Sequence, residues 1–183
     1  MKRLLVTMCA LALVFVCKES VAQKKMKAEK ASMKEKGTDK ISYPYTAMYS
    51  SDFKIGNSMD SKKILDLWKD WDDNAFDRHD YFADTAVMYL SDGMVVKGKD
   101  SISAGAMRYR GSLSSAKSTL EAWVPLKSVD KDQNWVALWG AETDTWPDGK
   151  TETRDIHEIW RFNKNGKVDF MKQFAAKPAE MQQ

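Results

Sequence analysis

Four strand-length runs fill the C-terminal part of the chain and constrain its fold more than any other feature. They span Ser118–Val129, Trp135–Trp146, Thr151–Phe162 and Lys167–Ala175. The connectors between them, DKDQN, PDGK and NKNGK, are rich in turn-forming residues. Because connectors this short join neighbouring strands in opposite directions, the sequence predicts a long antiparallel meander.

Helical signals precede these strands. From residue 58, a stretch opens with possible helix-capping residues and continues with apolar residues at helical spacing. The capping candidates are Ser58, Asp60 and Ser61; the spaced apolar residues are Ile64, Trp68, Trp71 and Ala75. We expect a short helical turn ending near Asp84, a hairpin of Thr85–Leu90 with Met94–Lys97, and a further helix that stops at Gly111. Helices followed by a meander predict an α+β fold with the helices on one face of a curved sheet.

The first 22 residues have the layout of a secretory signal peptide. A basic start is followed by an apolar run and by the small-residue pattern Ser20-Val21-Ala22, so we expect cleavage after Ala22. The run is too short for a comfortable membrane span, although an uncleaved anchor and lipid attachment at Cys17 are alternatives. The predicted location is the periplasm or the exterior, with no stable membrane span after cleavage.

Charge divides unevenly along the chain. The formal charge of +3 is made up of +2 for residues 1–22, +4 for the lysine-rich residues 23–40 and −3 for the rest. A folded part of mildly acidic charge lacks the basic face that nucleic-acid binding needs. We therefore expect residues 23–40 to be a disordered linker and predict no nucleic-acid partner.

The rest of the chain is long enough for one domain with its own core. We divide it into an N-terminal extension at 41–57, a domain at 58–176 and a tail at 177–183. Both cysteines, Cys9 and Cys17, lie in the expected signal peptide, so the domain would fold without a disulfide. Seven tryptophans between Trp68 and Trp160 supply much of its apolar surface.

Two stretches, FADTAVMYLSDGMVVKGKDSI and HEIWRFNKNGKV, resemble the nuclear transport factor 2-like superfamily, in its SnoaL-like and ketosteroid-isomerase-like branch. The resemblance covers roughly residues 58–176. It implies a cystatin-like α+β barrel, a cone-shaped and strongly bent antiparallel sheet with the N-terminal helices on its concave face. It also implies an apolar pocket at the open end and a homodimer through the outer sheet face. Members include isomerases, dehydratases, cyclases, epoxide hydrolases and binding domains, so the fold alone gives no activity.

Within the strand RDIHEIWRF, His157 and Glu158 must point to opposite faces. The residues in phase with Glu158 are Ile156, Trp160 and Phe162; those in phase with His157 are Asp155, Ile159 and Arg161. The first set is far more apolar, so we expect Glu158 to face the helices and His157 to face outward.

A carboxyl group among indoles is hard to ionise, and a neutral acid can act as a general acid or donate to an oxyanion. The resemblance places Glu158 where ketosteroid isomerases hold their oxyanion-binding aspartate, four residues before the phenylalanine that ends the strand. It puts Leu90 where their general base lies and Asp66 near the position of their first-helix tyrosine, so the same chemistry is not expected. Epoxide-hydrolase and dehydratase arrangements need further paired ionisable groups, and the sequence offers no obvious set.

Glu158 therefore stands as a candidate catalytic residue, with a structural alternative. In that alternative its carboxyl is satisfied by a backbone amide, a tyrosine hydroxyl, Arg154 or Arg108. The residues expected to line a ligand cavity are Trp68, Trp71, Met88, Tyr109, Trp139, Trp160, Met171 and Gln173. No cofactor and no metal are predicted, because metal sites need several converging ligands and His157 and His79 each stand alone.

Three hypotheses follow. The first is an exported domain that binds a small apolar molecule, with Glu158 as its polar anchor. The second is an enzyme of the isomerase, cyclase or dehydratase kind that uses Glu158 as general acid or oxyanion donor. The third is a dimeric interaction module whose cavity is filled by its own side chains. An open cavity with Glu158 in its wall would favour the first two.

Overall fold

The structure is a computed structural model that describes residues 42–178, so the expected signal peptide and linker lie outside the described residues. A boundary after Tyr45 separates two units, and every described helix and strand belongs to the second. Residues 42–178 form two helices, α2 (Ser58–Asp72) and α3 (Lys99–Gly111), and one seven-stranded sheet. The strands are β1 (Phe53–Ile55), β2 (Phe82–Tyr89), β3 (Val95–Lys97), β4 (Ser115–Ser128), β5 (Asn134–Thr145), β6 (Thr151–Phe162) and β7 (Val168–Ala176).

The predicted meander is confirmed as β4 to β7, which pair antiparallel in chain order. The complete sheet has the order β1-β4-β5-β6-β7-β2-β3. It is mixed rather than antiparallel, because β2 runs parallel to β7, with Met88 beside Met171. This pairing joins segments far apart in the sequence, and no turn fixes its direction. The prediction of a purely antiparallel sheet was therefore wrong at this one pairing.

Helix α2 begins where predicted, but its cap is Asn57, not Ser58, Asp60 or Ser61. The Asn57 side chain accepts a hydrogen bond from the backbone N–H of Met59 at 3.0 Å. Helix α3 ends at Gly111 as predicted. The expected helical turn near Asp84 is instead the start of β2, since Phe82 pairs with Val168 and is buried in the core.

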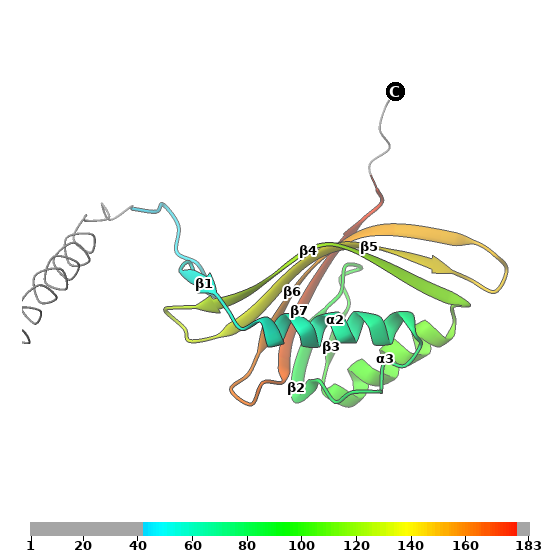
Figure 1. Cartoon of the computed structure of the whole chain (residues 1–183), viewed down its shortest axis with the longest axis horizontal. Coiled ribbons are helices and arrows are strands. Elements are labelled where there is room, and N and C mark those ends of the chain that lie inside the picture. The colour runs from blue at the N-terminus through cyan, green and yellow to red at the C-terminus, as the bar shows by residue number, and fades with distance from the viewer. Residues whose placement is uncertain (1–41, 179–183) are drawn as a thin grey trace, which may run out of the picture. The chain divides into compact units, whose positions relative to one another are not determined.

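Figure 1 shows α2 and α3 on the same side of the sheet. The alternation predicted for β6 is confirmed, with Ile156, Glu158, Trp160 and Phe162 buried and the residues between them more exposed. Ile156, Trp160 and Phe162 pack in one hydrophobic core with the buried face of α2, which includes Ile64 and Leu67. The sheet thus presents its apolar face to both helices.

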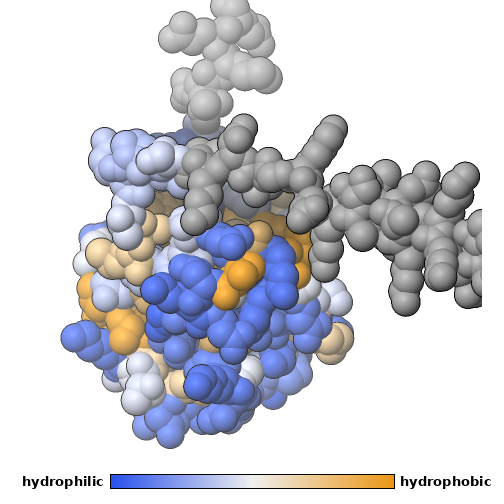
Figure 2. Space-filling model, turned by 90° about the vertical axis from the view of Figure 1, so that its left-hand side faces the viewer, coloured by the Kyte–Doolittle hydropathy of each residue, from blue (hydrophilic) through white to orange (hydrophobic). Residues whose placement is uncertain are grey.

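Strand β1 lies within the segment assigned to an N-terminal extension and was not predicted. It adds to the edge of the sheet beside β4, with Lys54 opposite Lys127. Figure 2 views the side of the β4–β5 and β6–β7 turns, where hydrophilic residues predominate and hydrophobic patches are small. Within residues 42–178, neither helix has the length and apolar character needed to cross a bilayer.

Candidate functional site

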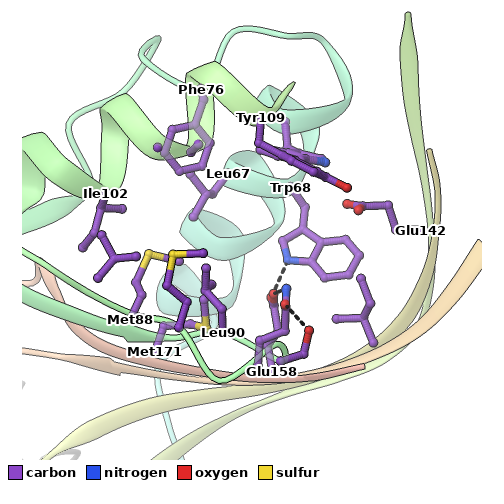
Figure 3. Close-up of a pocket in the computed structure, with 18 of the residues that line it drawn as sticks. Leu67, Trp68, Phe76, Met88, Leu90, Ile102, Tyr109, Glu142, Glu158 and Met171 are labelled. Atoms are coloured by element: carbon purple, nitrogen blue, oxygen red, sulfur yellow. Dashed lines mark hydrogen bonds between the residues drawn. The ribbon is translucent and has the colours of Figure 1, made fainter. Parts of the chain in front are cut away.

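A cavity of about 330 Å³ lies between the two helices and the sheet. Its wall is mostly apolar, and Figure 3 shows Leu67, Phe76, Met88, Leu90, Ile102 and Met171 around it. Most residues expected to line a cavity do line it, namely Trp68, Trp71, Met88, Tyr109, Glu158, Trp160, Met171 and Gln173. The expected set thus converges from α2, α3, β2, β6 and β7 on one space.

Trp139 is the exception and does not line the cavity. It lies opposite His157 in the β5–β6 register, and their rings meet edge to face with centroids 4.7 Å apart. Its neighbour Leu138 pairs with Glu158 and is fully buried on the helix-facing side. Since adjacent strand residues point to opposite faces, Trp139 belongs to the outer face with His157. The expectation for Trp139 was therefore wrong, and the outward orientation of His157 is confirmed.

Glu158 is only 4% exposed and accepts hydrogen bonds from three side chains. Trp68 Nε1 and Trp160 Nε1 donate to its Oε2 at 2.8 and 3.1 Å, and Gln173 Nε2 donates to its Oε1 at 2.9 Å. Burial raises the pKa of Glu158, while these three hydrogen bonds oppose the rise. None of the partners suggested by the structural alternative donates to Glu158. Its donors are two indole N–H groups and the side-chain amide of Gln173.

Strand geometry explains these contacts. Gln173 lies directly opposite Glu158 in the β6–β7 register, which brings the amide to the carboxyl. Trp160 is two residues along β6 and so shares the face of Glu158. The Gln173 side chain also accepts a hydrogen bond from Ser91 Oγ at 3.2 Å, which connects the β2–β3 turn to the cavity wall.

A second group of ionisable side chains borders the same cavity, and its two carboxylates, Glu142 and Asp144, were not expected from the sequence. Arg154 Nη2 donates to Glu142 Oε1 at 3.0 Å and to Asp144 Oδ2 at 2.8 Å, and Tyr109 Oη donates to the same Asp144 oxygen at 2.9 Å. Glu142, Arg154 and Tyr109 line the cavity, and Asp144 is fully buried behind them. Arg154 therefore pairs with these two carboxyls and not with Glu158.

The pKa values in this group move far from their usual range. Burial and the neighbouring Asp144 carboxyl raise the pKa of Glu142 to about 7, with a smaller contribution from Glu158 and against the effect of Arg154. Burial and the hydrogen bond to Asp144 raise the pKa of Tyr109 to about 12. Glu142 thus exchanges a proton near neutral pH, inside the cavity that also holds Glu158.

A signal for this group is present in the sequence. Glu142 and Asp144 are in phase with the apolar Leu138 on one strand, and Arg154 is in phase with Glu158 on the next. Charged residues on a strand are usually exposed, so the pattern alone does not reveal that Glu142 and Asp144 are buried. The β5–β6 register places Arg154 directly opposite Glu142, so the pair is satisfied internally.

Other buried polar atoms near the cavity have no hydrogen-bond partner within residues 42–178. They include Trp71 Nε1, Arg154 Nε and Asp144 Oδ1. The indole of Trp71 stacks on the Tyr109 ring, with centroids 6.0 Å apart and an interplanar angle of 13°. In the described part of the chain, no three His, Cys, Asp or Glu side chains cluster in a way that could hold a metal ion.

Comparison with solved structures identifies the fold. An NTF2-like protein of unknown function from Exiguobacterium sp. 255-15 is 21% identical, with 65% of this chain and 99% of that chain covered and a TM-score of 0.50. A protein assigned to the SnoaL-like polyketide cyclases, from Shewanella denitrificans, is 14% identical over 66% and 92% of the two chains, with a TM-score of 0.53. An LEH-like epoxide hydrolase from M. tuberculosis is 9% identical over 65% and 84%, also with a TM-score of 0.53.

No protein-family model matches the sequence, and the comparison with curated proteins gave no match. The structural similarity nevertheless shows that the chain has the NTF2-like, cystatin-like fold that its sequence resembles. Proteins with this fold include a cyclase-like protein and an epoxide hydrolase as well as proteins of unknown function. At these identities the likeness establishes the fold alone.

Proposed function

We propose that this domain binds a small, largely apolar molecule in its cavity and that Glu158 is the polar anchor of the site. The observation that carries the proposal is a nearly buried carboxyl group in the wall of a mostly apolar cavity. Ligand sites of this kind combine an apolar lining with a few placed polar groups. The cone-shaped sheet implied by the resemblance would leave the open end of such a cavity accessible.

The cavity size limits the ligand. An apolar cavity of about 150 Å³ can hold one benzene molecule. A cavity of about 330 Å³ therefore suits a compact molecule of roughly two rings. Indoles and the thioethers of Met88 and Met171 offer flat and adaptable contacts to such a body. A cavity of this size also argues against the third hypothesis, in which the protein's own side chains fill it.

Binding of 2-naphthol and naphthalene, measured by tryptophan fluorescence, tests this proposal. Both should bind, and 2-naphthol should bind more tightly because its hydroxyl group can donate to Glu158. Glu158→Gln should reduce the advantage of 2-naphthol; unchanged affinities in this variant would refute the anchor role.

A cavity-filling variant provides the control. Gly105 lines the cavity, and a Cβ at this position meets no other atom within 4 Å. Gly105→Leu should therefore abolish binding of both compounds by occupying the space. A Cβ at Gly111, on the same helix but outside the cavity lining, also meets nothing within 4 Å, so Gly111→Leu should bind as the wild type does.

A second candidate function is an enzyme of the isomerase, cyclase or dehydratase kind. It is favoured by Glu142, whose pKa of about 7 suits proton transfer near neutral pH, and which borders the same cavity as Glu158. In this scheme Glu142 removes or returns the proton while the Glu158 site holds the polar end of the substrate. The paired ionisable groups that the sequence did not reveal would supply this chemistry.

Proton transfer can be tested without knowing the natural substrate. We expect the domain to accelerate exchange of the α-protons of 2-tetralone into D₂O, measured by NMR, above the buffer rate. Glu142→Gln should lose the acceleration, while Glu121→Gln, on the exposed part of β4, should retain it. No acceleration in the wild type would leave binding as the function.

Export of the protein is the last part of the proposal. The signal-peptide pattern supports transport to the periplasm or the exterior. N-terminal sequencing of the protein from the periplasmic fraction should begin at Gln23, and recovery of the full chain from the cytoplasm would contradict export.

A further inference from the structure

The charges around the cavity are unbalanced. The carboxyl groups of Asp92, Glu142 and Glu158 border it, but Arg154 is the one guanidinium or ammonium group among its described lining residues. Arg154 is already bound by Glu142 and by the buried Asp144. Within residues 42–178, no lysine, arginine or histidine forms an ion pair with Glu158. Among the described residues, Glu158 is therefore a buried carboxyl group of the cavity wall that no cation compensates, whereas Glu142 is paired with Arg154.

The hydrogen bonds of Glu158 are those of an anion. Trp68, Trp160 and Gln173 all donate to its two oxygens, and no acceptor is bonded to it. A neutral carboxylic acid would need an acceptor for its own proton, whereas a carboxylate has about four acceptor positions. Three are occupied here, so one position on Oε1 remains for a further donor.

The remaining walls suit a weakly hydrated cation. The aromatic rings of Trp68, Trp71, Phe76, Tyr109 and Trp160 surround the cavity. Two of the indoles hold Glu158 through their N–H groups and also line the cavity. Cations with alkyl or aryl substituents are attracted to such faces, most strongly where water is excluded.

From these three features we infer that the ligand of the proposed site is an organic cation, an ammonium group on a flat apolar body, with its positive centre against Glu158. The inference rests on the proposed binding function and names its ligand class. Burial raises the pKa of Glu158, and an ammonium group against its oxygens would favour the ionised form. Asp92, exposed on the β2–β3 turn at the edge of the cavity, adds attraction for an approaching cation.

A pair of probes of the same shape tests the inference. N,N-dimethylbenzylamine is protonated at neutral pH, and isobutylbenzene has the same skeleton with a carbon in place of the nitrogen. By isothermal titration calorimetry, the wild type should bind the amine at least about tenfold more tightly, since tenfold corresponds to ~1.4 kcal/mol and a buried charge contact supplies that much. Glu158→Gln should bring the two affinities together, while Glu121→Gln should keep the preference.

Each other outcome has a defined meaning. Equal or tighter binding of isobutylbenzene by the wild type would overturn the cation class and leave the apolar-binding function standing. If neither probe binds, both the cationic ligand class and the proposed binding function would be overturned. An amine preference that survives in Glu158→Gln but disappears in Glu142→Gln would overturn the assignment to Glu158.

A measurement on the wild type covers the case in which Glu158→Gln does not fold. The pH midpoint at which the ¹³C resonance of the Glu158 carboxyl titrates should move to lower pH when the amine saturates the site. It should not move with isobutylbenzene; the same response to both probes would overturn the inference.

Discussion

The indole nitrogen of Trp68 lies 2.8 Å from Oε2 of Glu158, although the two residues are 90 positions apart in the chain. Trp160 donates to the same oxygen from within β6. The contact ties the buried face of α2 to the centre of the sheet at the cavity wall. Two tryptophans expected to line the cavity therefore also position the carboxyl group.

This contact predicts strong coupling between the two residues. Trp68→Phe should lower the free energy of unfolding by about 1–3 kcal/mol, because it leaves a buried carboxyl oxygen with one donor fewer. In a double-mutant cycle with Glu158→Gln, measured by urea unfolding, the interaction energy should be roughly 1 kcal/mol or more. Additive effects would contradict the contact. Trp71→Phe is the control, since Trp71 Nε1 has no hydrogen-bond partner within the described residues, and it should show no coupling to Glu158.

The raised pKa of Glu142 predicts that the free energy of unfolding falls as pH rises. Its pKa is raised from 4.5 to about 7 in the folded protein, so the native state keeps a proton that the unfolded chain has lost. The resulting stabilisation is complete below about pH 4.5 and disappears as pH rises through about 7. The free energy of unfolding should therefore fall by roughly 1–3 kcal/mol over this window, measured by urea titration at several pH values. Glu142→Gln should reduce this fall, leaving the part that Glu158 contributes through its own raised pKa, and Glu121→Gln should keep it in full.

Local sequence patterns were sufficient to predict most of the fold. Turn residues and period-two alternation predicted the β4–β7 meander, and β6 matches its expected bounds, Thr151–Phe162. The parallel contact of β2 with β7 could not be predicted in this way, because it depends on where the chain returns after α2. β1 is only three residues long and is held by backbone pairing at the sheet edge, which leaves no side-chain pattern.

The site was predictable only in part, and for a related reason. Alternation along β6 is enough to turn Glu158 inward and His157 outward. The same rule applied to β5 separates Leu138 from Trp139, but it needs the register with β6 to tell which of them faces the cavity. The ion-pair group of Glu142, Asp144 and Arg154 was not predicted, because a buried ionic group is recognisable only once its partners are known.

Arg110 predicts a structural role at the junction of the two helices. It is 4% exposed, and its Nε and Nη2 donate to the carbonyl oxygens of Trp71 and Asp72 at 2.7 and 2.9 Å, at the C-terminus of α2. Arg110→Met should lower the free energy of unfolding by roughly 1–3 kcal/mol, because the Asp72 carbonyl loses its side-chain donor and the Trp71 carbonyl keeps only backbone donors such as the N–H of Asn74. Arg108→Met, at an exposed position of the same helix, should change it by less than about 0.5 kcal/mol. Similar thermal unfolding of the two variants would contradict this role.

The outer sheet face predicts a homodimer. Trp139, His157 and Phe174 lie directly opposite one another across β5, β6 and β7, and their rings are in contact. Trp139 is 38% exposed and Phe174 50%, so this row presents aromatic surface on the side away from the helices. A second copy would cover it, because buried aromatic residues contribute strongly to interfaces.

Sedimentation velocity provides the measurement. The wild type should sediment as a dimer, and Phe174→Lys should sediment as a monomer, since a charge would be buried without a partner at the centre of the interface. Met107→Lys, which also replaces an exposed apolar residue but lies on α3, should remain dimeric. A monomeric wild type would refute the homodimer. A dimer that Phe174→Lys leaves intact and Met107→Lys dissociates would place the interface at α3 and not on the outer sheet face.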